Sequence, residues 1–234
     1  MHTLTQFRLC PFSRAVRLAL AEQSIDVELI DERPWEWRPE FLALNPAGEL
    51  PVLQLERGPA LCGVYAISEY LAEGMAAATP EVDEVESFPL LPGDRTQRAE
   101  TRRLIDWFNS KFNREVTHEL LQEKVYARLQ PAASATPDVD FLRAIRTNLR
   151  YHMSYISYLA DRRRWLAGED LSFADLAAAA HLSSVDYLGE VPWEEYAVAK
   201  VWYARLKSRR AFRTLLADRV AGVQAAAHYA NLDF

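Results

Sequence analysis

A cysteine near the start of the chain stands where a thiol could do chemistry. Cys10 precedes Pro11, and apolar residues recur after Pro11 at the spacing of a helix face. Proline is favoured at the first position of a helix, so Cys10 is expected at a helix N-terminus. The positive end of the helix dipole lowers the pKa of a thiol and makes it more nucleophilic. Cys10 is therefore a candidate for thiol exchange, and the alternative is a buried or idle cysteine.

A second informative stretch covers residues 41–71. The run Asn45-Pro46-Ala47-Gly48 is a helix stop, and residues 50–55 read as a strand with Pro51 near its start. Proline cannot donate to a ladder, so this is the beginning of a strand or an edge where something else can pair. Residues 60–62 form another short apolar run, and a helical period begins after Gly63.

The elements around these residues fall into two groups. Residues 2–7 and 25–30 alternate apolar and polar side chains and predict strands, with a helix between them. From Asp94 the chain reads helical almost to its end. The sequence predicts an α/β domain at residues 1–76, a linker at 77–93, an all-helical domain at 94–219 and a tail at 220–234.

Composition narrows the class of protein. The net charge of −6 argues against non-specific binding of nucleic acid. Two cysteines form no disulfide framework, and neither a long apolar run nor a signal-peptide pattern is present, so we expect a cytoplasmic protein without membrane insertion. The five histidines lack ligand-like spacing, and we expect no metal site.

The unit around Pro51 resembles the second half of the thioredoxin-like domain of glutathione transferases. The motifs that carry the resemblance are NPAGELPVL and, further on, AISEYL. It implies the cytosolic glutathione-transferase fold, α/β plus all-α, with an N-terminal thioredoxin-like domain and a C-terminal all-helical domain. In that family the proline equivalent to Pro51 is cis, which turns the backbone of Leu50 outward to hold the cysteinyl part of glutathione.

The sequence departs from this family where the γ-glutamyl end of glutathione is held. The family opens the next helix with Glu-Ser, but aligning on Ala66-Ile67 puts Gly63 and Val64 there. The lost hydrogen bonds to charged groups are worth roughly 1.5–3 kcal/mol each, or about a hundred- to ten-thousandfold in affinity together. We therefore expect no cofactor and a vestigial glutathione groove formed by Cys10, Leu50, Pro51, Gly63 and Val64.

Ser172 with Asp175 three residues on is a variant of the capping box, before an alanine-rich helix at 173–187. It resembles the folding motif of the family's C-terminal domain. Its expected role is structural, so Asp175 is not interpreted as catalytic.

Three surfaces are candidates for binding a partner. The loop at 32–39 places Trp35 and Trp37 beside Arg38, a composition typical of interface hot spots, or the rings fill the core instead. Arg143, Arg146 and Arg150 share one helix face, which meets a partner or is simply solvated. The tail either docks on a partner or folds back on its own subunit, and its candidate residues are His228, Tyr229, Asn231, Leu232, Asp233 and Phe234.

From end to end the chain resembles a bacterial family of glutathione-transferase homologues that bind FtsZ, the tubulin-like division GTPase. The segments ERPWEWRPEFLALNPAGELPVL, FNREVTHELLQEKVYARL and HYANLDF carry this resemblance. It implies a homodimer at the division site that binds FtsZ and shapes its filaments without conjugating glutathione. The segment CPFS supports an alternative, because it resembles the active site of omega-type transferases. On that reading the protein is a glutathione-dependent thiol transferase or reductase that uses Cys10.

Overall fold

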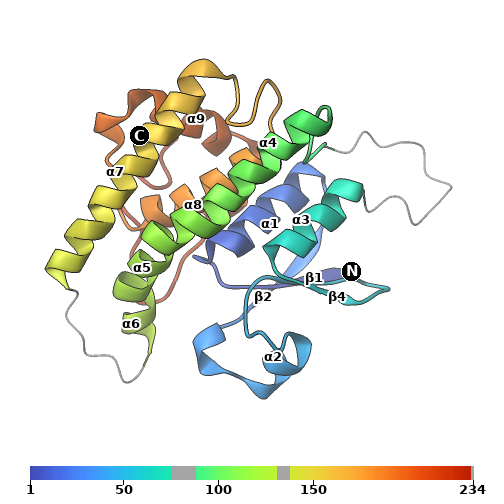
Figure 1. Ribbon diagram of the computed structural model, residues 1–234. Helices are drawn as coiled ribbons and strands as arrows, with labels where there is room; N and C mark the ends of the chain where they lie inside the picture. Colours follow the sequence, from blue (N-terminus) through green and yellow to red (C-terminus); the bar gives the residue numbers. More distant parts are fainter. Residues whose placement is uncertain (75–87, 131–137, 233–234) are drawn as a thin grey trace.

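The computed structural model describes residues 1–74, 88–130 and 138–232 (Figure 1). Its N-terminal part contains one sheet with the strand order β2-β1-β3-β4. The strands are β1 (His2–Gln6), β2 (Val27–Asp31), β3 (Val52–Gln54) and β4 (Ala60–Cys62). β2 runs parallel to β1, while β3 is antiparallel to both β1 and β4.

Helices lie on both sides of this sheet. α1 (Pro11–Glu22) and α3 (Val64–Glu73) lie on one side, and α2 (Pro39–Leu44) follows the short helix η1 (Pro34–Glu36) on the other. The β1–α1 turn places Cys10 at the N-cap of α1 with proline next to it, as the sequence predicts. α1 buries nearly all of its first nine residues because it lies between the sheet and the helical domain.

The C-terminal part consists of helices. A long helical rod comprises α4 (Arg95–Asp106), the π-helical stretch η3 (Trp107–Thr117), α5 (His118–Leu121), the π-helical stretch η4 (Gln122–Tyr126) and α6 (Ala127–Leu129). α7 (Val139–Arg162) lies beside it, and α8 (Phe173–Tyr187) passes behind both. The chain ends with η5 (Trp193–Glu195), α9 (Ala197–Lys207), η6 (Arg210–Phe212), α10 (Arg213–Leu216) and an irregular segment.

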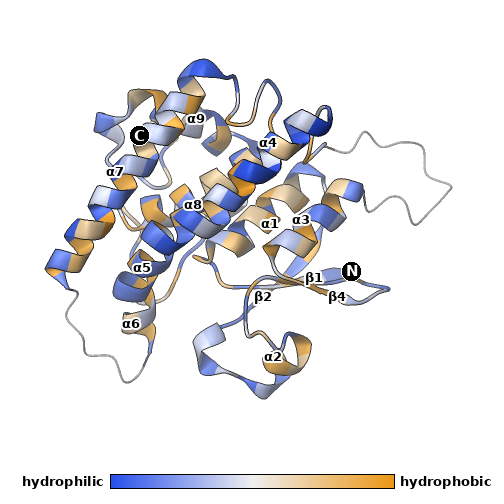
Figure 2. Ribbon diagram, in the orientation of Figure 1, coloured by the Kyte–Doolittle hydropathy of each residue, from blue (hydrophilic) through white to orange (hydrophobic). Residues whose placement is uncertain are grey.

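α8 is the centre of the helical domain, and every one of its residues is buried. Its alanines let α1 approach closely, so the two domains share one hydrophobic core. Hydropathy follows this arrangement, because α8 and α1 are largely apolar while the outer side of α4 is strongly hydrophilic (Figure 2). The predicted class, α/β plus all-α, is confirmed. Among the described helices, none has the length and apolarity that crossing a bilayer requires.

The N-terminal ends of α4 and α8 are capped as the sequence predicts. The Asp94 carboxylate accepts from the backbone N–H of Thr96 (2.8 Å) and Gln97 (2.9 Å), and the Gln97 side chain accepts from the Asp94 N–H. At α8, Asp175 Oδ2 accepts from the backbone N–H of Ser172 at 3.2 Å. Asp175 Oδ1 also accepts from the N–H groups of Leu166 (2.8 Å) and the Trp202 indole (3.0 Å). The buried carboxylate thus ties three segments together.

Candidate functional site

A cleft of about 370 Å³ lies between the start of α3 and the rod at η3. The Leu50–Pro51 peptide bond is cis, and Leu50, Gly63 and Val64 line this cleft together. Gly63 is the N-cap of α3 with φ of 85°, and its N–H donates to the Pro51 carbonyl at 2.9 Å. The structure therefore brings Leu50, Gly63 and Val64 of the predicted groove to one place.

The charged side chains that line the cleft are mostly acidic. Glu49, Glu69 and Asp106 line the cleft together with one basic residue, Arg102. Arg102 donates to both oxygens of Glu69, at 3.0 and 2.9 Å, so its charge is already neutralised. Asp106 accepts from the Ser110 hydroxyl at 2.8 Å. The cleft consequently offers little attraction for a ligand that carries carboxylates.

Cys10 differs from the expectation for a helix N-terminus. Its side chain is 8% exposed and belongs to a hydrophobic cluster with Phe7 and Tyr229. Burial raises the pKa of the Cys10 thiol, and this outweighs the lowering by hydrogen bonds from Ser13 and Phe12. Of the two alternatives for Cys10, this environment matches the buried cysteine, because the loss of water outweighs the effect of the helix N-terminus on the thiol. Among the described residues, α1 lines the cleft with Phe12 rather than Cys10.

The two tryptophans of the loop at 32–39 have different environments. Trp35 packs between Phe7 and Tyr126, with ring centroids 5.2 and 5.0 Å away. Trp37 is 62% exposed, and its ring lies so close to Gly48 that a Cβ there would be 2.9 Å from the indole. Trp35 is therefore a packing residue. Trp37 is exposed to solvent on one side and lies against Gly48 on the other.

A buried carboxylate holds the Trp37 loop in place. The side chain of Glu32 is 2% exposed and accepts from Arg38 through both oxygens, and from the backbone N–H of Arg33 at 2.9 Å. The hydrogen bonds from Arg38 lower the pKa of Glu32, against the effect of its burial. Glu32 was missed at the sequence level, because nothing in the loop's composition shows which of its acids is buried.

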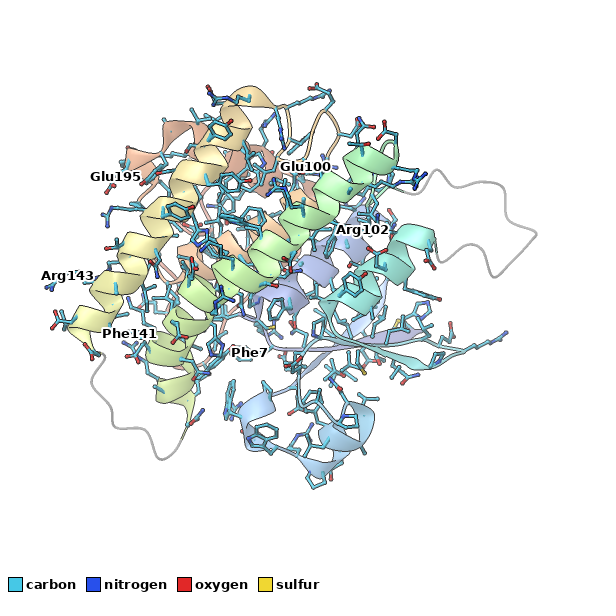
Figure 3. All side chains as sticks on the ribbon, in the orientation of Figure 1. Phe7, Glu100, Arg102, Phe141, Arg143 and Glu195 are labelled. Carbon is cyan, nitrogen blue, oxygen red and sulfur yellow. The ribbon has the colours of Figure 1, made fainter. Side chains whose placement is uncertain are left out.

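The predicted arginine stripe is paired within the chain. Arg143 donates to Asp140 at 2.7 Å, and the outer side of the helical domain carries Arg143 and Glu195 (Figure 3). Arg146 pairs with Glu190 at 2.8 Å, and Arg150 pairs with Glu195 at 2.9 Å. Each of these arginines pairs with one carboxylate, so they are less available to a partner than the sequence suggests.

The tail folds back on its own subunit as far as Tyr229. Tyr229 is fully buried, and its hydroxyl lies 2.9 Å from Arg14 Nη1 and 3.0 Å from the Leu215 carbonyl oxygen. His228 Nε2 lies 2.8 Å from the buried Asp186 carboxylate. Asn231 and Leu232 are exposed, with Leu232 at 46%, while Asp233 and Phe234 lie outside the described residues, as do residues 77–87 of the predicted linker.

Two family models match the chain. Residues 9–73 match the N-terminal domain of glutathione S-transferases, and residues 127–210 match the C-terminal domain. With the fold described above, the chain belongs to the glutathione S-transferase family. One side of the cleft is formed by residues of the first matched segment, and the other side is formed by residues 102–110 of the rod, which lie between the two matched segments.

Within that family, the chain is similar along nearly its whole length to a protein named for its localisation with FtsZ. FtsZ-localized protein A of Caulobacter vibrioides is 47% identical, over 99% of this chain and 98% of the relative. The structure of FzlA from C. crescentus superposes with a TM-score of 0.91 at 46% identity, covering 100% of this chain and 99% of that one. A glutathione S-transferase structure from Rhodospirillum rubrum gives the same TM-score and identity over both whole chains. Yeast glutathione S-transferase 2 is more distant, at 26% identity over 89% of this chain and 87% of the relative.

Proposed function

We propose that this protein is a non-enzymatic regulator of cell division that binds FtsZ. The observation that carries the proposal is the 47% identity to FtsZ-localized protein A over almost the full length of both chains. The protein would act as a homodimer at the division site. Two binding sites on one particle can bridge or bend a filament through avidity, with no chemical step.

The cleft supports a role without glutathione. The position that would hold the γ-glutamyl group carries Gly63 and Val64, which offer no side-chain hydrogen bond, and Glu49 and Asp106 add negative charge. Glutathione carries two carboxylates and one ammonium group, and neither Gly63 nor Val64 has a side chain that could hold its γ-glutamyl end. The raised pKa of buried Cys10 disfavours the alternative of thiol transfer as well.

The exposed Trp37 is the best-supported contact for FtsZ. A large rigid aromatic ring that is already held in place loses little entropy on binding, and such residues dominate interface energies. Arg38 and Glu32 fix its backbone, while Asn231 and Leu232 present a second exposed surface at the tail. The paired arginines of α7 are the third candidate contact for FtsZ.

Co-sedimentation with polymerised FtsZ tests this proposal. We expect the full-length protein to sediment with FtsZ, and Trp37→Ala to weaken binding by about 30-fold, the effect of losing roughly 2 kcal/mol at a hot spot. Removal of residues 231–234 should weaken either this binding or the division function. Val201→Ala is the control, since Val201 on α9 is as exposed as Trp37, at 64% against 62%.

Two results would contradict the proposal. One is that neither the full-length protein nor any variant shows FtsZ-dependent sedimentation. The other is submillimolar glutathione binding in a calorimetric titration, which would favour the thiol-transfer alternative with Cys10 instead.

A further inference from the structure

One buried carboxylate accepts from three arginines of the N-terminal domain. Asp218, whose side chain is 1% exposed, lies just after α10. Arg17 donates to both of its oxygens, at 2.8 and 3.1 Å. Arg14 reaches Asp218 at 3.4 Å and Arg8 reaches it at 3.3 Å. The buried Arg14 and Arg17 and the partly exposed Arg8 therefore share one buried anion.

The same cluster holds the C-terminal segment. Arg14 is fully buried and also donates to the hydroxyls of Ser183 (2.8 Å) and Tyr229 (2.9 Å). Tyr229 in turn anchors the chain directly before the exposed Asn231 and Leu232. Arg14 thus contacts both Asp218 and the C-terminal segment.

In the other direction, the cluster reaches the Trp37 loop through Arg8. Arg8 is 37% exposed and bridges Asp218 to Asp31, with Nη2 at 2.9 Å and Nε at 3.0 Å from Asp31 Oδ2. Asp31 ends β2, and the next residue is Glu32, which accepts hydrogen bonds from Arg38. We call this pair the Glu32 clamp. The backbone carbonyl of Arg8 also accepts from Arg14 Nε at 2.6 Å.

We propose that Asp218 and Arg8 are positioning residues that couple the tail to the Trp37 loop. This inference rests on the proposed function in one respect: the two coupled segments are the two exposed surfaces assigned there to partners. When a partner pulls the segment around Tyr229 away from Arg14, Asp218 is displaced and Arg8 loses one of its two carboxylates. The end of β2 and the Glu32 clamp then become looser, and Trp37 is held less firmly.

The coupling has a physical cause. A buried charge without its partner is strongly disfavoured, so the arginines around Asp218 keep or lose their geometry together. Arg8 transmits the change because it is the partly exposed member and contacts acids on both sides. A docked and an undocked C-terminal segment are the two states that the coupling requires.

Hydrogen exchange of backbone amides on the full chain, without FtsZ, tests the coupling. Asp218→Asn should speed exchange about tenfold both in residues 220–232 and in residues 31–38, because it removes the shared anion. Arg8→Gln should speed exchange in 31–38 only. In the double variant, exchange in 31–38 should be no faster than in Arg8→Gln alone. Arg143→Gln, which loses only an exposed pair with Asp140, is the matched control and should change neither segment.

The coupling is refuted if Asp218→Asn speeds exchange in 220–232 alone, or if its effect on 31–38 simply adds to that of Arg8→Gln. If Asp218→Asn does not fold, Tyr229→Phe takes its place, since it removes one hydroxyl and no charge. That variant should speed exchange in 31–38 in the wild-type background and not in Arg8→Gln. Because the readout requires no partner, failure here leaves the FtsZ proposal standing, and absent FtsZ binding leaves the coupling standing.

Discussion

Gly63 shows how one residue can change the chemistry of a cleft and the backbone at once. Its φ of 85° is a conformation that residues with a Cβ rarely adopt, and a Cβ there would meet no atom within 4 Å. A glutamate at this position would therefore be strained by its backbone, not by crowding. Glycine avoids that strain and also lacks the side chain that would contact the γ-glutamyl group. This supports the proposal that the groove does not bind glutathione.

Glu100 provides the clearest pH dependence in the molecule. It lies near one end of the helical domain and accepts from Arg103 at 2.7 and 2.8 Å and from Arg163 at 2.8 Å (Figure 3). The hydrogen bond from Arg103, assisted by that from Arg163, lowers the pKa of Glu100 from 4.5 to about 2. A carboxylate with a lowered folded-state pKa stabilises the fold above its unfolded pKa, and this contribution is lost as the pH falls toward the folded value.

We therefore predict that Glu100→Gln flattens the acid side of the stability profile. In wild-type protein, Glu100 should account for a loss of about 2 kcal/mol in the free energy of unfolding between pH 6 and pH 3. Urea unfolding at a series of pH values measures this. A variant that loses as much stability as the wild type over this range would show that the ion pair contributes nothing.

At the scale of elements, local sequence signals predicted most of the fold. Proline after Cys10 predicted the start of α1, and Asp94 and Ser172 predicted helix starts, because helix ends depend on a few neighbouring residues. The π-helical stretches η3 and η4 were not predicted, since no local pattern distinguishes them from α-helix. The fold class followed from the motifs around Pro51.

The candidate site was less predictable, because its properties depend on contacts between distant segments. The pKa of Cys10 depends on burial. The ion pairs of Asp218 join residues that are about 200 positions apart in the chain. The loop composition indicated that Trp35 and Trp37 either bind a partner or fill the core, and it left open which ring is exposed. That distinction is set by Tyr126, which packs on Trp35 from the helical rod.

The two capping acids allow a direct comparison of an exposed and a buried helix cap. We predict that Asp94→Ala lowers the free energy of unfolding by about 1 kcal/mol, as expected for an exposed N-cap. Asp175→Ala should cost about 3–5 kcal/mol, because it leaves the buried N–H groups of Leu166, Ser172 and Trp202 without their acceptor. Urea unfolding of both variants tests this, and equal losses would mean that Asp175 acts as a cap and nothing more.

At the scale of the whole molecule, the C-terminal segment is part of the core. Val223 and Tyr229 pack in the same cluster as Phe7 and Leu9 of the N-terminal domain. The chain therefore closes the gap between the domains with residues close to its end. Any experiment that alters the tail has to separate loss of packing from loss of a binding surface.

Two single substitutions make this separation. Tyr229→Ala should lower the free energy of unfolding by about 3–5 kcal/mol, because it empties a buried aromatic site and removes a partner of buried Arg14. Leu232→Ala should change it by no more than about 0.5 kcal/mol, because that side chain is 46% exposed. Urea unfolding measures the stability of both variants, and co-sedimentation of the same proteins with FtsZ measures their binding. If Leu232→Ala weakens sedimentation while its stability is unchanged, the tail acts by contact. If only Tyr229→Ala weakens it, the tail acts by holding the two domains together.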